Sequence, residues 1–278
     1  MPARDCYLEL LSRSLLGETY LDNELRIRYL RQCLRGEAAF DEAVLYDIRR
    51  HQPERIGELE RTIELGMPVG TDLEQLPFTY TMLGRKRLEN VAFCVETLLR
   101  ERVPGDLIEC GVWRGGSAVF MRGLLAAYED AERVVWVADS FQGLPPAVLE
   151  ADRALGLDLT KEKVPALAVS LDTVKRAFSA HGLLDARVKF LEGWFADTLP
   201  AAPIERLALL RVDGDLYSST TDALGALYDR VVPGGFVIVD DYFLPNCRQA
   251  VDDFIVARRM TEPIERIDWT GIFWRKPR

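Results

Sequence analysis

The spacing of hydrophobic residues changes near residue 81, and the change divides the chain into two parts. Over residues 1–65 apolar side chains recur at helical spacing, at Tyr7, Leu8, Leu10, Leu11 and Leu15 and again at Leu25, Ile27, Leu30 and Leu34. Glycine and proline interrupt this pattern over residues 65–77, which predicts a linker or the hinge of a lid. We therefore predict a helical amino-terminal extension and lid over residues 1–80.

From residue 81 onward, short apolar runs alternate with helical patterns. The predicted strands are 107–110, 133–138, 188–191, 207–212, 236–239 and 271–274, and the predicted helices are 84–101, 117–128, 172–181, 221–231 and 248–259. This alternation is typical of a doubly wound α/β fold, in which helices cover both faces of a mostly parallel sheet. Right-handed crossovers bring the loops that follow the strands to one rim of the sheet.

Composition narrows the kind of partner and the cellular location. The 278 residues carry a net charge of −9, which argues against a nucleic-acid partner held by its phosphates. The five cysteines form no CxxC pair, so we expect reduced structural thiols. No leader-like segment and no apolar run of membrane-spanning length is visible, and we expect a cytoplasmic protein without a membrane partner.

The first predicted strand runs into a glycine turn that suits a small cofactor. Residues 106–117 read DLIECGVWRGGS, with Glu109 near the end of the strand, Gly111 in the turn and Ser117 at the start of a helix. A turn of this kind brings backbone and the N–H groups of a helix start against a ligand. The spacing G-x-x-x-G-G does not match the dinucleotide pattern GxGxxG.

Asp139 ends the second predicted strand, where an acidic side chain can accept hydrogen bonds from both hydroxyls of a ribose. Such a residue serves NAD and S-adenosylmethionine equally well. The two cofactors differ in the pyrophosphate, which S-adenosylmethionine lacks, so the irregular glycine spacing favours S-adenosylmethionine. After the third strand, Gly193, Trp194 and Phe195 are candidates for an adenine wall, and ordinary core packing of the two aromatic rings is an equally good explanation.

Three aspartates follow two further strands. Asp213 ends one apolar run, and Asp240 and Asp241 end the next, so all three should meet at the same rim. Converging carboxylates repel one another unless a cation neutralises them, and their hard oxygens suit Mg²⁺. The alternative is that individual aspartates cap the next helix or turn. The two histidines, His51 and His181, stand at no strand end, which argues against a histidine general base.

The combination of these motifs resembles the macrocin O-methyltransferase family. The matching runs are TMLGRKRLEN, PGDLIECGVWRGG, VADSFQGLP, LRVDGDLYSST, PGGFVIVDDY and CRQAVDDF. The resemblance implies a seven-stranded, Rossmann-like S-adenosylmethionine-dependent methyltransferase domain over residues 81–278, with Mg²⁺ as a second cofactor. It assigns Asp213, Asp240 and Asp241 to the metal, and Glu109, Gly111, Ser117, Asp139 and Ser140 to the cofactor. Thr81 and Met82 are placed at the methionine end of the cofactor by looser analogy with related metal-dependent methyltransferases.

The implied activity is methylation of a deoxysugar hydroxyl on a natural-product glycoside such as an antibiotic precursor. Asp213 is then the candidate for removing the hydroxyl proton, because it can lie near both metal and acceptor. Two other functions fit the same motifs: methylation of a catechol or other phenol, and a non-catalytic subunit that binds S-adenosylmethionine. A nicotinamide oxidoreductase is a weaker alternative. The partner expected is a small-molecule glycoside, and the helical extension suggests a homodimer or higher homo-oligomer.

Overall fold

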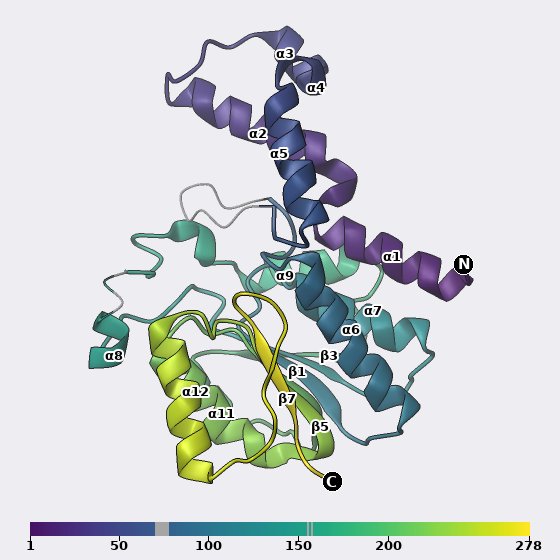
Figure 1. Cartoon of the computed structure of the whole chain (residues 1–278), viewed down its shortest axis with the longest axis vertical. Helices are drawn as coiled ribbons and strands as arrows, with labels where there is room; N and C mark the ends of the chain where they lie inside the picture. The colour runs from purple at the N-terminus through teal and green to yellow at the C-terminus, as the bar shows by residue number, and fades with distance from the viewer. Residues whose placement is uncertain (70–77, 155, 157) are drawn as a thin grey trace. The chain divides into compact units, whose positions relative to one another are not determined.

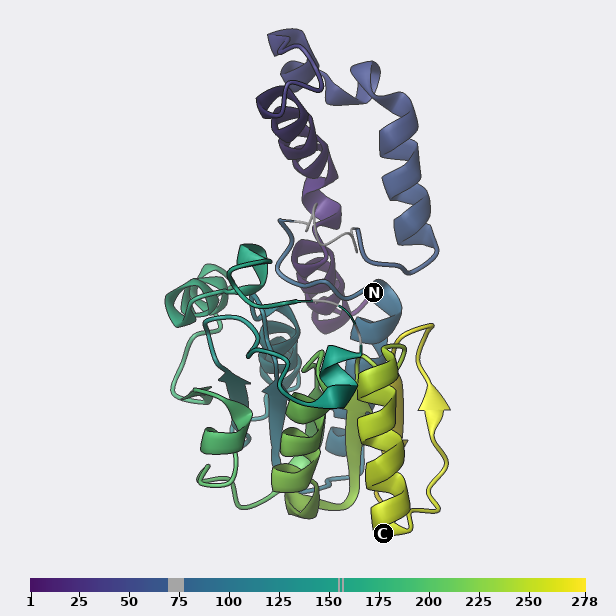
Figure 2. The ribbon, with the colours of Figure 1, turned by 90° about the vertical axis from the view of Figure 1, so that its left-hand side faces the viewer.

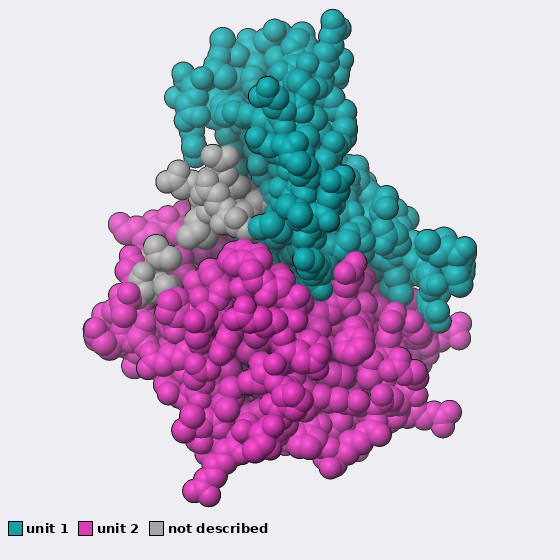
Figure 3. Space-filling view, in the orientation of Figure 1, with its two compact units in different colours: residues 1–88 teal, residues 89–278 magenta. Residues whose placement is uncertain are grey.

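The structure is a computed structural model that describes residues 1–69, 78–154, 156 and 158–278. The chain divides into two compact units, Met1–Leu88 and Glu89–Arg278, which Figure 3 colours separately. Most of the predicted linker, residues 70–77, lies outside the described residues. The lid function predicted for residues 1–80 stays a prediction.

The amino-terminal unit is built from helices around a small apolar core. Its helices are α1 (Ala3–Leu15), η1 (Glu18–Tyr20), α2 (Leu21–Leu34), α3 (Glu42–Tyr46), α4 (Ile48–His51) and α5 (Pro53–Glu64). Leu25 and Tyr29 of α2 are buried against Ile48, Ile56 and Leu59, so α2, α4 and α5 share one core. The helical spacing read from the sequence is confirmed for α1 and α2.

The second unit contains a seven-stranded sheet with the order β3-β2-β1-β4-β5-β7-β6. Figure 1 labels β1, β3, β5 and β7 of this sheet. The strands are β1 (Asp106–Cys110), β2 (Val135–Asp139), β3 (Val188–Glu192), β4 (Leu207–Val212), β5 (Val231–Val239), β6 (Glu265–Arg266) and β7 (Ile272–Arg275). The first five strands pair in parallel, whereas β7 runs antiparallel to β5 and to β6. The predicted fold class is confirmed.

Helices cover both faces of this sheet. The helices from residue 85 onward are α6 (Arg85–Arg100), which begins in the first unit, and α7 (Gly116–Ala127), α8 (Glu150–Arg153), η3 (Pro165–Leu167), α9 (Leu171–Ala180), α10 (Phe195–Thr198), α11 (Tyr217–Leu227), η4 (Tyr228–Arg230) and α12 (Pro245–Arg258). Among them, α8 contacts α11 and α12. Helices α11 and α12 pack side by side on one face, and α7 lies on the other (Figures 1 and 2). Among the described residues, no helix is both long enough and apolar enough to cross a membrane.

Side-chain alternation along the central strands decides what lies on each face. Cys110 and Val212 belong to the apolar core beneath α11 and α12, together with Ile108 and Leu210, which lie two residues before them. Because successive side chains of a strand point to opposite faces, Glu109 and Arg211 point to the α7 face, and β1 and β4 align them as direct neighbours. Two buried charged residues thus lie side by side near the end of the sheet.

The two predicted starts that differ most from the structure each have a physical cause. The helix predicted to begin at residue 221 begins at Tyr217, because Asp152 accepts hydrogen bonds from the N–H groups of Tyr217 and Ser218 and caps it from outside. Strand β5 begins five residues before the predicted run 236–239 and includes Pro233, Gly234 and Gly235, which favour a turn in sequence. The short elements α8, α10 and β6 were not predicted.

Candidate functional site

The candidate site lies where β2, β1, β4 and β5 end, next to one another in the sheet. The parallel hydrogen-bond pattern continues one residue past each strand. The N–H of Gly111 donates to Ala138 O at 2.9 Å, that of Asp213 to Cys110 O at 2.8 Å, and that of Asp240 to Val212 O at 2.9 Å. The strand register itself therefore places the glycine turn, Asp213 and Asp240 in a row along one rim.

Asp213, Asp240 and Asp241 form a compact group of carboxylates at this rim. Each of them offers an oxygen, and the three oxygens lie within 4.8 Å of one another. Asp240 is 3% exposed and Asp241 is 8% exposed, whereas the side chain of Asp213 is 28% exposed and half-buried. Burial, followed by the charges of Asp215 and Asp213, holds the pKa of Asp241 well above its ordinary value. Two buried carboxylates and a half-buried one that repel one another fit a hard divalent cation such as Mg²⁺.

Asp215 is a fourth carboxylate of this rim that the sequence analysis did not single out. Its backbone adopts a left-handed φ of 58°, its N–H donates to Asp241 Oδ2 at 3.1 Å, and its carbonyl accepts from Asn246 Nδ2 at 3.0 Å. Burial, followed by the charges of Asp213 and Asp240, raises the pKa of Asp215 to about 7. The available signal was the D-G-D spacing, which returns a second carboxylate to the rim two residues after Asp213.

Arg211 is the second residue that sequence reasoning missed, since it lies inside an apolar strand run. Its side chain is 1% exposed and forms ion pairs with Glu109, with Asp213 Oδ2 at 3.0 Å and with Asp240 Oδ1 at 2.6 Å. Burial opposes the arginine's charge, but the three carboxylates keep its pKa well above the ordinary value. Burial raises the pKa of Glu109 to about 7, although the neighbouring Arg211 charge and the Ser117 hydroxyl both lower it.

The glycine turn is shaped by its contact with Asp213. Gly111 has a φ of 87°, and a Cβ atom added there would lie 1.7 Å from the carbonyl oxygen of Asp213. A glycine at this position is therefore required by the close approach of two loops of the rim. The predicted cofactor residues Gly111 and Glu109 are brought next to the carboxylate group, and Ser117 lies buried in the first turn of α7.

Asp139 ends β2 and organises the loops around it. Its Oδ2 accepts from Val112 N–H and its Oδ1 from Phe141 N–H, both at 2.8 Å. Burial raises the pKa of Asp139, while these backbone N–H groups lower it. The Ser140 hydroxyl donates to Gly143 O at 2.6 Å, a hydrogen bond within the loop that follows β2.

The predicted adenine wall is adjacent to Asp139. Gly193, with a φ of 139°, donates its N–H to the carbonyl of Asp139 at 3.0 Å, and Trp194 precedes α10 and is half-buried. Phe195 packs against the apolar core beneath α11, which matches the core-packing alternative for that ring. A contact between Trp194 and adenine stays a prediction.

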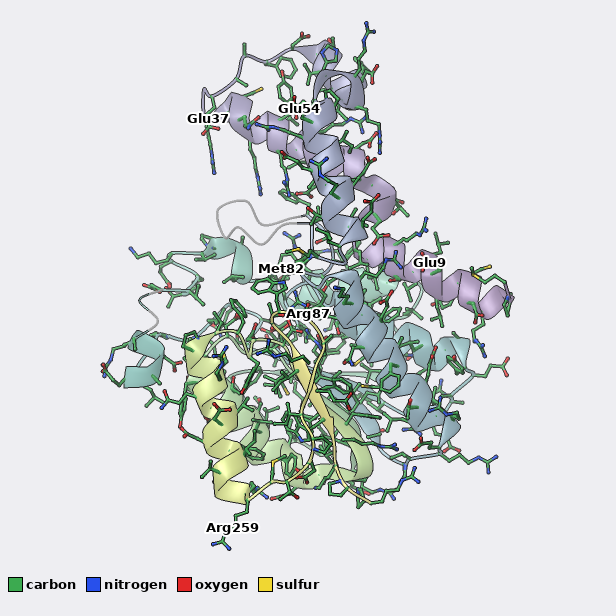
Figure 4. The ribbon with its side chains drawn as sticks, in the orientation of Figure 1. Glu9, Glu37, Glu54, Met82, Arg87 and Arg259 are labelled. Carbon is green, nitrogen blue, oxygen red and sulfur yellow. The ribbon has the colours of Figure 1, made fainter. Side chains whose placement is uncertain are left out.

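Thr81 and Met82 belong to the amino-terminal unit. Thr81 Oγ1 accepts from Leu83 N–H at 3.1 Å, and the carbonyl of Met82 accepts from Arg87 Nη2 at 3.5 Å. Figure 4 labels Met82 and Arg87. Their predicted contact with the methionine end of the cofactor stays a prediction.

Comparisons with known proteins agree with the motifs. The Macrocin-O-methyltransferase (TylF) family matches residues 4–276. The chain is 45% identical over 276 residues to 8-demethyl-8-(2,3-dimethoxy-alpha-L-rhamnosyl)-tetracenomycin-C 4'-O-methyltransferase of Streptomyces olivaceus, covering 98% of this chain and 93% of that protein. It is 50% identical over 200 residues to Mycinamicin III 3''-O-methyltransferase of Micromonospora griseorubida, covering 71% and 78%. The solved structure of the O-methyltransferase NovP is 40% identical, covers 99% of this chain and 100% of that one, and superimposes with a TM-score of 0.78.

The contact between Gly111 and Asp213 predicts the effect of Gly111→Ala. Gly182 also has a positive φ, 68°, but a Cβ atom there would have nothing within 4 Å. Gly182→Ala should therefore cost roughly 1 kcal/mol for the left-handed backbone alone. Gly111→Ala adds a backbone collision and should cost at least about 3 kcal/mol. Unfolding in urea measures both, and equal losses would contradict a tight contact between these loops.

Proposed function

The chain belongs to the macrocin O-methyltransferase family, and from this membership we propose that it methylates a sugar hydroxyl of a glycoside, with S-adenosylmethionine as donor and Mg²⁺ as second cofactor. The observation that carries the proposal is the group formed by Asp213, Asp240 and Asp241 beside the glycine turn. Two relatives are named for methylation of sugar positions, on a rhamnosyl tetracenomycin and on mycinamicin III. We infer an acceptor of the same class, a deoxysugar attached to a natural-product aglycone.

We propose that S-adenosylmethionine binds over the end of β1. Asp139 would accept the ribose hydroxyls in addition to the N–H groups of Val112 and Phe141. Glu109, Gly111, Ser117 and Ser140 would line the same pocket, because the turn after β1 and the loop after β2 run along this rim. When bound, the cofactor supplies an electrophilic methyl group on a sulfonium, which loses its charge as the methyl leaves. A positively charged pocket is therefore not needed.

We propose that Asp213, Asp240 and Asp241 hold Mg²⁺. The ligand atoms are hard oxygens from two neighbouring strand ends, and their mutual repulsion leaves a site that a dication stabilises. When bound, the ion supplies positive charge that lowers the pKa of an adjacent sugar hydroxyl and fixes its approach. The chain's own contribution is to bring the acceptor and the cofactor pocket to the same rim.

Two carboxylates compete for the role of proton acceptor. The sequence favoured Asp213, but its carboxylate pairs with Arg211 and belongs to the proposed ligand group. Asp215 stands outside that group and lies close enough for its charge to act on Asp241. Its backbone is held by hydrogen bonds to Asp241 and Asn246. We propose that Asp215 takes the proton and that Asp213 serves as a ligand.

Metal removal tests the proposed reaction. The isolated chain should methylate a member of a panel of deoxysugar glycosides and should leave catechol unmodified. EDTA should reduce product at least 100-fold, and excess Mg²⁺ should restore it, as measured by mass spectrometry of the acceptor. Full turnover in EDTA would exclude the metal. Catechol as the sole substrate would instead favour a phenol methyltransferase, and dependence on an added protein would indicate a non-catalytic subunit.

Asp215→Asn and Asp213→Asn separate base from ligand. Asp215→Asn should lower kcat about 100-fold or more, the usual scale for a general base, while Mn²⁺ affinity falls less than fivefold. Asp213→Asn should weaken Mn²⁺ binding at least tenfold, because an amide is a poorer ligand than a carboxylate. Calorimetry with Mn²⁺ and initial rates decide the matter. If Asp215→Asn keeps its rate while Asp213→Asn keeps its metal and loses turnover, Asp213 is the base.

A further inference from the structure

The side chain of Arg211 reaches the proposed metal group from inside the sheet. It starts from β4, lies on the α7 face and is 1% exposed, so water cannot substitute for its partners. Nη1 pairs with Asp213 Oδ2 at 3.0 Å and also with Glu109, and Nη2 pairs with Asp240 Oδ1 at 2.6 Å. One planar group thus contacts two of the three proposed ligands and one residue of the proposed cofactor pocket.

This arrangement has two opposite effects on a bound cation. The arginine's charge offsets part of the negative charge of the carboxylates, which weakens their attraction for a metal. A hydrogen bond from Nη1 also fixes one oxygen of Asp213, and the ion pair at Nη2 holds one oxygen of Asp240 beside it, so the two carboxylates are oriented before any ion arrives. Side chains that orient metal ligands typically contribute 10- to 100-fold in affinity, and the orienting effect should therefore dominate.

We propose that Arg211 is the positioning residue of the metal site: it orients Asp213 and Asp240 for the cation and connects them to Glu109. The inference rests on the proposed function, because it takes these aspartates as ligands. A guanidinium is needed because its separate nitrogens contact separate carboxylates. A lysine at this position keeps the charge but presents a single nitrogen, so it cannot hold both carboxylates in the same geometry.

Metal titration of full-length variants tests this inference without an acceptor. Calorimetry measures the dissociation constants of Mn²⁺ and, separately, of S-adenosylhomocysteine for the wild type, Arg211→Met and Arg211→Lys. Both variants should bind Mn²⁺ at least tenfold more weakly. The Mn²⁺ dissociation constant should rise at least fivefold more than that of S-adenosylhomocysteine, a ratio that general loosening of the domain would not produce.

Arg122→Met is the matched control. Arg122 is a second buried arginine, 6% exposed, and it pairs with Asp185 in the loop before β3, at the opposite end of the strands. Its replacement should destabilise the domain but change Mn²⁺ affinity less than twofold. Thermal unfolding of all variants reports folding. If Arg211→Met does not fold, Arg211→Lys carries the test.

The outcomes distinguish this inference from the proposed function. A wild type that binds S-adenosylhomocysteine but no Mn²⁺ would remove the metal from the proposed function, and the inference with it. If the wild type binds both, unchanged or tighter Mn²⁺ binding by Arg211→Met would overturn the inference alone and make the arginine a mere competitor of the metal. Wild-type Mn²⁺ affinity in Arg211→Lys would overturn it as well, because charge without the fork would then suffice.

Discussion

Carboxylates that repel one another are held at one rim of the sheet by a buried arginine, and the proposed site depends on that interaction. Arg211 can do this because β4 lies between β1 and β5, so its side chain reaches Glu109 on one neighbour and Asp240 on the other. The alternation continues to Asp213, one residue past the end of β4, whose carboxylate pairs with the same guanidinium. A parallel sheet with this strand order therefore provides both the acidic group and its counter-charge.

A second network, made of hydrogen bonds, fixes Asp215 and Asp241. Asp152, fully buried in the short helix α8, accepts hydrogen bonds from the start of α11 and from Asn246 at the start of α12. Asn246 also donates to the carbonyl of Asp215, whose N–H donates to Asp241. Asp215 and Asp241 are thus fixed through helix starts, while Asp213 and Asp240 are fixed through β4. The segment after β2, which contains α8, is tied to the proposed base by the same hydrogen bonds.

The sequence was sufficient for features that depend on local pattern. Alternating apolar runs predicted the strands and most of the helices. Because parallel strands end at the same edge of a sheet, the sequence also predicted that Asp139, Asp213, Asp240 and Asp241 lie at one rim. It was insufficient where a residue acts through a distant partner. Arg211 looked like one polar interruption of an apolar strand, and the early start of α11 depends on Asp152, which is 65 residues away. The reason for Gly111 is likewise non-local, because its missing side chain makes room for the backbone of Asp213.

The central claim is that the glycine turn and the three aspartates form one site that holds a divalent cation beside the cofactor. Crystals grown with Mn²⁺ and S-adenosylhomocysteine test it most directly through the anomalous signal of the metal. The account predicts one strong peak about 2 Å from a carboxylate oxygen each of Asp213, Asp240 and Asp241, with the cofactor product over the end of β1. A bound S-adenosylhomocysteine with no such peak, or a peak on other residues, would contradict it.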